Sequence, residues 1–238
     1  GVGAHQYAAH DLVTGLPEGV DMPLARVPGG TYFGRVMHKV YEVVDTSKDL
    51  REEVTRAIDI HASSALLRPF RDQLIEGVIA SYRTPLGMPF YGKALADIAP
   101  SDRLSELDFE MSLANLSKGV LASDIGKLLK DSLETNDLLY AYSDTLSDSS
   151  FDIPLAGLLN GSIDAVIRVH AEDGSPRLFI TDYKTNRLDS DEDVSLIEAY
   201  APERLVAAME HHHYPLQALL YGTALYRMLR WRRPAWDA

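Results

Sequence analysis

The sequence predicts an α/β domain in which helices flank a central, mixed β-sheet. Apolar residues recur at helical spacing over residues 31–44, which is typical of an amphipathic helix. Acidic and apolar residues alternate over 106–113, as in a half-buried strand. Two further β-rich segments, 161–169 and 177–185, flank an Asp-Gly dipeptide at 173–174, a strong hairpin signal. With further helices expected over 49–61 and 63–82, the N-terminal half is predicted to be helical.

Further helices are expected in four places, each from its apolar periodicity. They are residues 49–61, 63–82, 121–133 and 214–229. Residues 1–30 are rich in Gly and Pro and predict a linker or irregular lead-in, so that the domain would span 31–238. The two ends of the sequence indicate a fragment excised from a longer chain, truncated at its C-terminal end.

The amino-acid composition excludes several kinds of metal site and disfavours one mode of nucleic-acid binding. The chain has 238 residues, 46% of them hydrophobic and 24% charged, which is typical of a globular domain. It contains no cysteine, which excludes disulfides, iron–sulfur clusters and thiolate zinc sites, so a metal must be held by oxygen and imidazole ligands. A net charge of −12 disfavours a protein that binds nucleic acid through its overall field. With no apolar run of about 18 residues, we expect a soluble cytoplasmic protein without a membrane partner.

The expected hairpin brings two carboxylates close together. A two-residue turn at 173–174 pairs residues whose numbers sum to about 347, so Asp164 would lie within one residue of the position opposite Asp182, and a bulge could align them. Period-2 spacing puts Asp182 and Lys184 on one strand face. Two carboxylates about 4 Å apart repel by roughly 4 kcal/mol at an effective dielectric near 20, which favours a cation between them.

These residues admit two interpretations. In the first, Asp164 marks an exposed strand edge, and residues 182–184 are a solvated strand end with a cross-strand ion pair. In the second, the three residues serve phosphodiester hydrolysis, which needs hard oxygen ligands for Mg²⁺ and a cation for the developing negative charge. The hairpin context favours the second interpretation.

Four segments resemble the PD-(D/E)xK nuclease superfamily and, within it, the family of C-terminal nuclease domains of RecB. They are residues 34–42, 157–168, 180–188 and 214–229, in family order. The resemblance implies a restriction-endonuclease-like core and divalent-metal-dependent cleavage of DNA. It also implies that Asp164, Asp182 and Lys184 form the catalytic set.

The resemblance implies further site residues. His38 and the backbone carbonyl of Tyr183 are expected as metal ligands beside the two aspartates. Glu106 resembles an additional catalytic acid of the family, although Glu110 lies on the same strand face and is an open alternative. Glu42, four residues after His38, either orients the imidazole or forms an ordinary helix-surface pair.

Two residues of the last helix match the family's Q-x-x-x-Y pattern. Gln217 and Tyr221 lie one helical turn apart and are expected to bind the DNA substrate. In the alternative interpretation, Tyr221 belongs to the core and Gln217 is a surface amide.

The resemblance therefore implies a Mg²⁺-dependent deoxyribonuclease, the nuclease domain of an exodeoxyribonuclease V, in double-strand break processing and recombinational repair. Mn²⁺ is expected to substitute for Mg²⁺, and Ca²⁺ to bind without supporting cleavage. The expected partners are DNA, helicase domains of a parent chain and partner subunits of a RecBCD-like complex. The alternative is a catalytically silent nuclease fold that serves as a docking or regulatory module.

Overall fold

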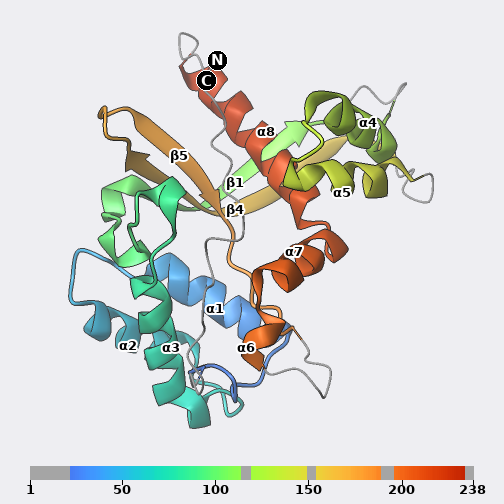
Figure 1. The fold of residues 1–238 in the computed structure, drawn as a ribbon. Coiled ribbons are helices and arrows are strands. Elements are labelled where there is room, and N and C mark those ends of the chain that lie inside the picture. Colours follow the sequence, from blue (N-terminus) through green and yellow to red (C-terminus); the bar gives the residue numbers. More distant parts are fainter. Residues whose placement is uncertain (1–21, 114–118, 149–153, 189–195, 234–238) are drawn as a thin grey trace. The chain divides into compact units, whose positions relative to one another are not determined.

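The computed structural model describes residues 22–113, 119–148, 154–188 and 196–233 (Figure 1). The chain divides into two compact units. Unit 1 contains the described residues up to Arg103 together with 168–177 and 183–208; unit 2 contains 104–167, 178–182 and the residues from Met209 onward. The boundary passes between Asp182 and Tyr183, and the single domain over 31–238 stays a prediction. Among the described residues, none of the helices combines the length and hydrophobicity needed to span a bilayer.

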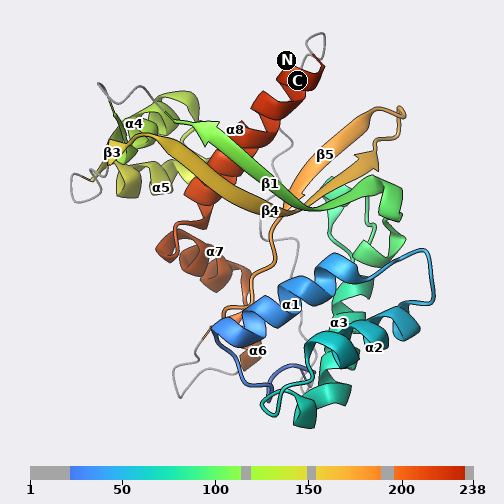
Figure 2. The same ribbon diagram turned by 180° about the vertical axis from the view of Figure 1, so that it is seen from behind.

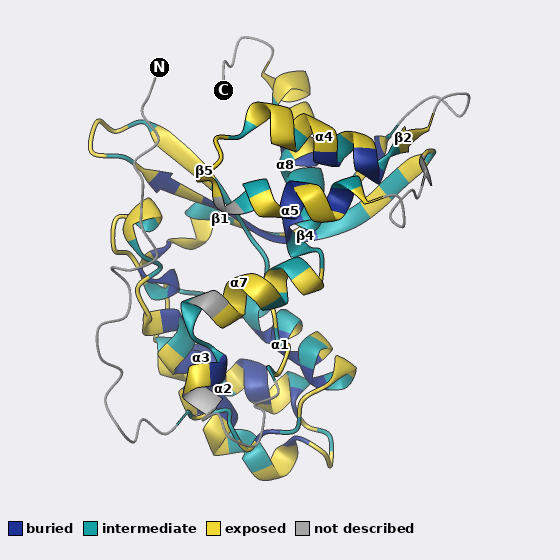
Figure 3. Ribbon diagram, turned by 45° about the vertical axis from the view of Figure 1, so that its right-hand side comes forward, coloured by how far each residue is buried: buried dark blue, intermediate teal, exposed yellow. Residues whose placement is uncertain are grey.

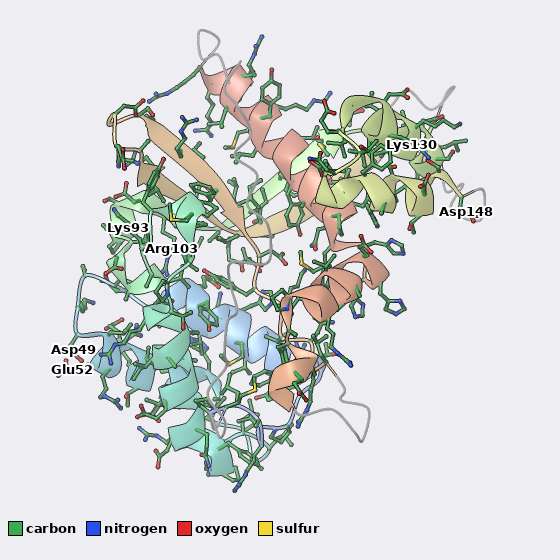
Figure 4. The ribbon with its side chains drawn as sticks, viewed as in Figure 1. Asp49, Glu52, Lys93, Arg103, Lys130 and Asp148 are labelled. Carbon is green, nitrogen blue, oxygen red and sulfur yellow. The ribbon has the colours of Figure 1, made fainter. Side chains whose placement is uncertain are left out.

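Unit 1 is built on three helices. They are α1 (Thr31–Val43), α2 (Leu50–His61) and α3 (Arg71–Arg83). The apolar stripe of α1 is buried, as its periodicity predicts. Asp49 caps α2 by accepting a hydrogen bond from the backbone N–H of Glu52 at 2.9 Å, and Figure 4 shows both residues at that helix end. The predicted helices over 31–44 and 49–61 are therefore confirmed.

The third predicted helix begins later than expected. The sequence pattern suggests a helix from residue 63, but α3 starts at Arg71 and follows a short 3₁₀ turn, Arg68–Phe70. Pro69 lies in this turn. Because proline has no N–H group and disfavours the helical region for the residue before it, the α-helix starts only after the proline.

The described part of the expected lead-in packs on unit 1. Residues 22–30 contain no helix or strand, yet Val27 is only 3% exposed. A Cβ atom at Gly77 would lie 2.5 Å from the side chain of Leu24, which shows how closely this segment approaches α3. Residues 1–21 lie outside the described residues.

Unit 2 is organised by a three-stranded sheet in the order β1-β4-β5. The strands are β1 (Arg103–Ser112), β4 (Leu158–His170) and β5 (Pro176–Thr181). The long helix α8 (Tyr214–Arg232) lies across β1 and β4 (Figure 2). Its Leu225 packs with Ile163 and Val166 of β4 in a buried cluster. This packing holds the sheet against α8.

The α/β fold class is confirmed, with helices flanking a small central sheet. The three described strands pair antiparallel, whereas a mixed sheet was expected. A parallel pair requires a crossover connection that returns to the sheet. After β5, the described residues instead form α6 (Leu196–Ala199), α7 (Pro202–His211) and α8, and no further strand of this sheet.

A smaller substructure completes unit 2. The short strands β2 (Val120–Leu121) and β3 (Pro154–Leu155) pair antiparallel. Helix α4 (Ala122–Ser132) confirms the helix predicted over 121–133. Helix α5 (Leu138–Ser147) runs into the polar stretch 143–150 and was not expected. Its Tyr142 and Leu146, four residues apart, are both fully buried, and Figure 3 shows buried residues on both helices.

Candidate metal centre

The hairpin between β4 and β5 has a three-residue loop, not the two-residue turn expected. The backbone N–H of Ala171 donates to the carbonyl of Ser175, and that of Gly174 donates to the carbonyl of Ala171, both at 2.9 Å. Gly174 has φ of 78°, a left-handed conformation that glycine adopts without strain. The loop shifts the pairing by one residue, so that opposite residues have numbers summing to 346.

The new register continues along the two strands toward the two aspartates. The hydroxyl of Thr181 donates to the carbonyl of Ala165 at 3.1 Å, in the same register. Strand β5 ends at Thr181, so this register would bring Asp182 level with Asp164 only if it continued one residue beyond the strand. Asp164 is 9% exposed, and the Oδ2 atom of Asp182 is shielded from solvent. The pairing of Asp164 with Asp182 stays a prediction.

A third carboxylate lies beside Asp164. One carboxylate oxygen of Glu106 on β1 lies within 4.8 Å of one of Asp164 on β4. Ser162, which the sequence analysis missed, donates its hydroxyl to Glu106 at 3.1 Å. Its only sequence signal was its position two residues before Asp164 on the same strand face. Like charges this close repel one another, and a cation between them offsets the repulsion.

Glu106 also has an unusual backbone conformation. Its φ is 51°, in the left-handed region, although it lies within a strand. This region costs a residue with a Cβ atom about 1–2 kcal/mol, and such costs concentrate at functional sites. Glu110 lies four residues further along β1, roughly 13 Å away at strand spacing, and lines an open cavity of about 580 Å³ with Asn160. The geometry favours Glu106 over Glu110 as the partner of Asp164.

In unit 1, the segment after Asp182 packs on α1. The ring of Tyr183 meets that of His38 edge to face, with centroids 6.3 Å apart. Gly34 lies one turn before His38, and a Cβ atom there would lie 2.9 Å from the hydroxyl oxygen of Thr185. The Gly34-x-x-x-His38 spacing therefore has a physical reason: glycine permits the close approach, and His38 lies beside the residue that follows Asp182.

Glu42 forms a helix-surface pair. It accepts a hydrogen bond from the Lys39 ammonium at 2.6 Å. This is the second of the two interpretations that the sequence left open for Glu42.

The expected strand position of Lys184 is wrong. Strand β5 ends at Thr181, so Asp182 and Lys184 do not share a strand face, and Lys184 is exposed. The strand ends because the next residues leave the ladder and pack on α1, with Tyr183 stacked on Tyr41 at 4.4 Å between centroids. Alternation predicts side-chain direction only while the chain stays in the sheet.

On α8, Gln217 and Tyr221 interact with each other. The Gln217 amide donates to the Tyr221 hydroxyl at 2.7 Å. The Tyr221 ring packs against the core of unit 2 and meets Phe109 edge to face at 5.6 Å. Tyr221 is therefore a core residue at its ring and a polar partner of Gln217 at its hydroxyl.

The chain is similar in sequence to RecB proteins of several bacteria. No family model matches it. RecB, a RecBCD enzyme subunit, from Mycolicibacterium smegmatis is 39% identical over 92% of the chain, and RecB from Mycobacterium tuberculosis strain H37Rv is 40% identical over 93%. The chain is homologous to RecB. Escherichia coli RecB is 28% identical over 88% of the chain. The resemblance predicted from the four segments is confirmed.

The chain spans about a fifth of the length of these RecB proteins, 21% of both mycobacterial relatives. The similarity therefore concerns one part of RecB.

Proposed function

We propose that this chain is a divalent-metal-dependent deoxyribonuclease domain that acts in double-strand break processing and recombinational repair. Its relatives are named as RecB subunits of the RecBCD enzyme, which supports a role in such a complex. The observation that carries the proposal is the carboxylate pair of Glu106 and Asp164 on adjacent strands, and Asp182 directly follows the end of β5. Acids this close, on adjacent strands, suit a bound cation.

The donor set fits Mg²⁺. Mg²⁺ prefers oxygen ligands, mainly carboxylates, and tolerates imidazole, while the chain has no thiolate to favour a softer metal. The proposed ligands are His38, Glu106, Asp164, Asp182 and the backbone carbonyl of Tyr183. A bound divalent ion supplies charge stabilisation at the scissile phosphate and lowers the pKa of water. Mn²⁺ is expected to replace Mg²⁺ because it accepts the same ligands and binds nitrogen more readily.

The chain's own residues supply the remaining steps. Lys184 is a cation and cannot ligate another cation, so we assign its ammonium to the scissile phosphate or to the attacking water. One of the carboxylates would accept the proton that the attacking water loses. Gln217 orients the Tyr221 hydroxyl, and we place this pair on the DNA backbone.

The negative net charge of the chain suggests that its partners help it to bind DNA. At −12, the overall field repels DNA phosphates, so the chain alone should bind duplex DNA weakly and in a salt-sensitive manner. We propose that helicase domains and partner subunits of a RecBCD-like complex present the DNA to this site. The acidic surface thereby limits cleavage by the domain on its own.

A cleavage assay on linear duplex DNA tests the proposal. The chain should cleave with Mg²⁺ or Mn²⁺, not with EDTA, and Ca²⁺ should bind without supporting cleavage. Asp164→Asn should abolish cleavage, whereas Glu110→Gln, on the same sheet and away from the pair, should retain it. A folded chain that cleaves DNA with neither Mg²⁺ nor Mn²⁺, even at a high concentration of either ion, would overturn the proposal. Such a result would favour the docking-module alternative.

A further inference from the structure

Three tyrosines of unit 1 form a continuous stack. The rings of Tyr41 and Tyr82 lie 5.4 Å apart between centroids with planes 11° apart. The rings of Tyr41 and Tyr183 lie 4.4 Å apart between centroids with planes 19° apart. The stack joins α1, α3 and the segment after β5, three parts of the chain that are distant in sequence. Tyr41 is its central member because it contacts both others.

Hydrogen bonds fix the inner two rings. The Tyr41 hydroxyl and the Ser81 hydroxyl lie 2.5 Å apart, and the Tyr82 hydroxyl donates to the Tyr41 carbonyl at 3.2 Å. Tyr82 is fully buried. Burial raises the pKa of both Tyr41 and Tyr82 above the usual tyrosine value, so both rings stay neutral. The stack is thus a rigid, uncharged platform.

Each end of the stack leads to a residue assigned above as a metal ligand. Tyr183 is bonded directly to Asp182. At the other end, the Arg103 guanidinium donates to the Tyr82 hydroxyl at 3.2 Å and to the Val44 carbonyl at 2.6 Å. Arg103 begins β1, three residues before Glu106. The tyrosine stack and its hydrogen bonds therefore hold two chain segments in place. One segment adjoins Asp182 and the other leads to Glu106.

We propose that Tyr41 is a positioning residue: its ring holds the tyrosine stack together, and the stack fixes the segments that carry Asp182 and Glu106. Residues 182–188 have no regular secondary structure, so backbone hydrogen bonds of a ladder cannot hold them. At the start of this segment, the stacking of Tyr183 on Tyr41 holds the chain on α1. Such packing matters because metal ligands must stay within about 0.5 Å of their working positions. The metal part of this proposal rests on the proposed function, whereas the fastening of the two segments does not.

Two measurements on the 238-residue chain test the proposal. Amide hydrogen exchange without metal reports whether the segments at 178–188 and 103–108 are fastened, and calorimetric titration with Mn²⁺ reports the ligand geometry. Tyr41→Leu keeps an apolar side chain but removes the ring. It should raise exchange in both segments at least severalfold and weaken Mn²⁺ affinity about tenfold. Tyr41→Phe keeps the ring and should stay close to the parent chain in both measurements.

Control variants separate positioning from general loss of stability. Tyr142→Leu removes a fully buried tyrosine of unit 2 that takes no part in the stack. At a comparable loss of melting temperature, it should leave exchange at 178–188 unchanged. If Tyr41→Leu does not fold, Tyr183→Leu removes the same contact from the less buried end of the stack and should produce the same exchange pattern.

The outcomes are distinguishable. Unchanged exchange and unchanged Mn²⁺ affinity in Tyr41→Leu would overturn the inference, as would an equal effect of Tyr142→Leu on the two segments. If the parent chain binds no Mn²⁺ while Tyr41→Leu still raises exchange, the proposed function fails and the fastening role of the stack stands.

Discussion

Two acid-rich regions of this molecule are arranged in opposite ways. Between α2 and α3, carboxylates face arginines: Asp59 accepts two hydrogen bonds from Arg71, at 2.5 and 2.9 Å, and Glu76 accepts two from Arg51, at 2.6 and 3.0 Å. On the sheet of unit 2, a carboxylate oxygen of Glu106 lies within 4.8 Å of one of Asp164. Each acid of the first region accepts hydrogen bonds from an arginine, and two acids of the second region lie close to one another.

The difference supports the proposal that a metal ion binds in the second region. Arginine hydrogen bonds hold the pKa values of Asp59 and Glu76 below their usual ranges, so these acids are ionised and satisfied at neutral pH. Neighbouring carboxylates destabilise one another's charged forms, and the protein gains only if something else stabilises them. Composition alone does not separate the two regions, because both are rich in acids.

The largest expected effect is the loss of a carboxylate from the sheet. Asp182→Asn should lower the cleavage rate about a thousandfold or more, because several kcal/mol of transition-state stabilisation depend on the bound ion. The melting temperature should stay the same or rise, since the substitution removes repulsion from Asp164. Single-turnover cleavage and thermal unfolding are the measurements. Wild-type cleavage by this variant at saturating Mg²⁺ would contradict the assignment.

The next effect separates Lys184 from His38. Lys184→Ala should slow cleavage about 10²- to 10³-fold, as for loss of a charge-stabilising group, and leave Mn²⁺ affinity nearly intact. His38→Ala should weaken Mn²⁺ affinity about 10- to 100-fold and regain cleavage at high Mn²⁺, because it removes a ligand. Calorimetric titration of both variants decides between these roles. The reverse pattern would refute the mechanism and leave the homology to RecB untouched.

Much of the fold was predictable because its signals are local. The stripe of α1 and the alternation of β1 follow from periodicity, and both elements begin and end within a few residues of the predicted positions. The late start of α3 also has a local sequence signal, Pro69, but the apolar periodicity of residues 63–82 predicted an earlier start. Helix α5 was missed because its polar residues mask two buried positions, Tyr142 and Leu146.

The candidate site was less predictable because its geometry depends on distant contacts. The Asp-Gly signal located the hairpin, but the loop has three residues, and only the loop length decides whether Asp164 faces Asp182. The end of β5 at Thr181 depends on packing against α1, which no local pattern encodes. The tyrosine stack draws on three distant segments, so its members looked like ordinary core residues in the sequence.

A smaller effect concerns the backbone at Glu106. With φ of 51°, this residue should be replaced favourably by glycine, so Glu106→Gly should be about 1 kcal/mol more stable than Glu106→Ala. Because both variants lack the carboxylate, the difference between their free energies of unfolding isolates the contribution of the backbone conformation. For a chain of this size, that amounts to roughly 2–4 °C in melting temperature. Equal melting temperatures would show that the conformation carries no strain.

The smallest effect is expected in the arginine-matched region, at Asp59. Asp59→Asn should leave cleavage and Mn²⁺ affinity unchanged, which makes it the matched control for the Asp182 variant: the same chemical change at an acid that faces a cation. Its melting temperature should fall only slightly at neutral pH, because the pair with Arg71 is exposed and screened by solvent.

The pH dependence of this small effect follows from the lowered pKa of Asp59. A carboxyl whose pKa is lower in the folded than in the unfolded chain stabilises the fold above the unfolded value and loses that contribution as pH falls through the folded value. Melting curves of the parent chain and of Asp59→Asn should therefore differ at neutral pH and converge below the ordinary aspartate range. A difference that persists in acid would show that the hydrogen bonds from Arg71 act through packing and not through the charge of Asp59.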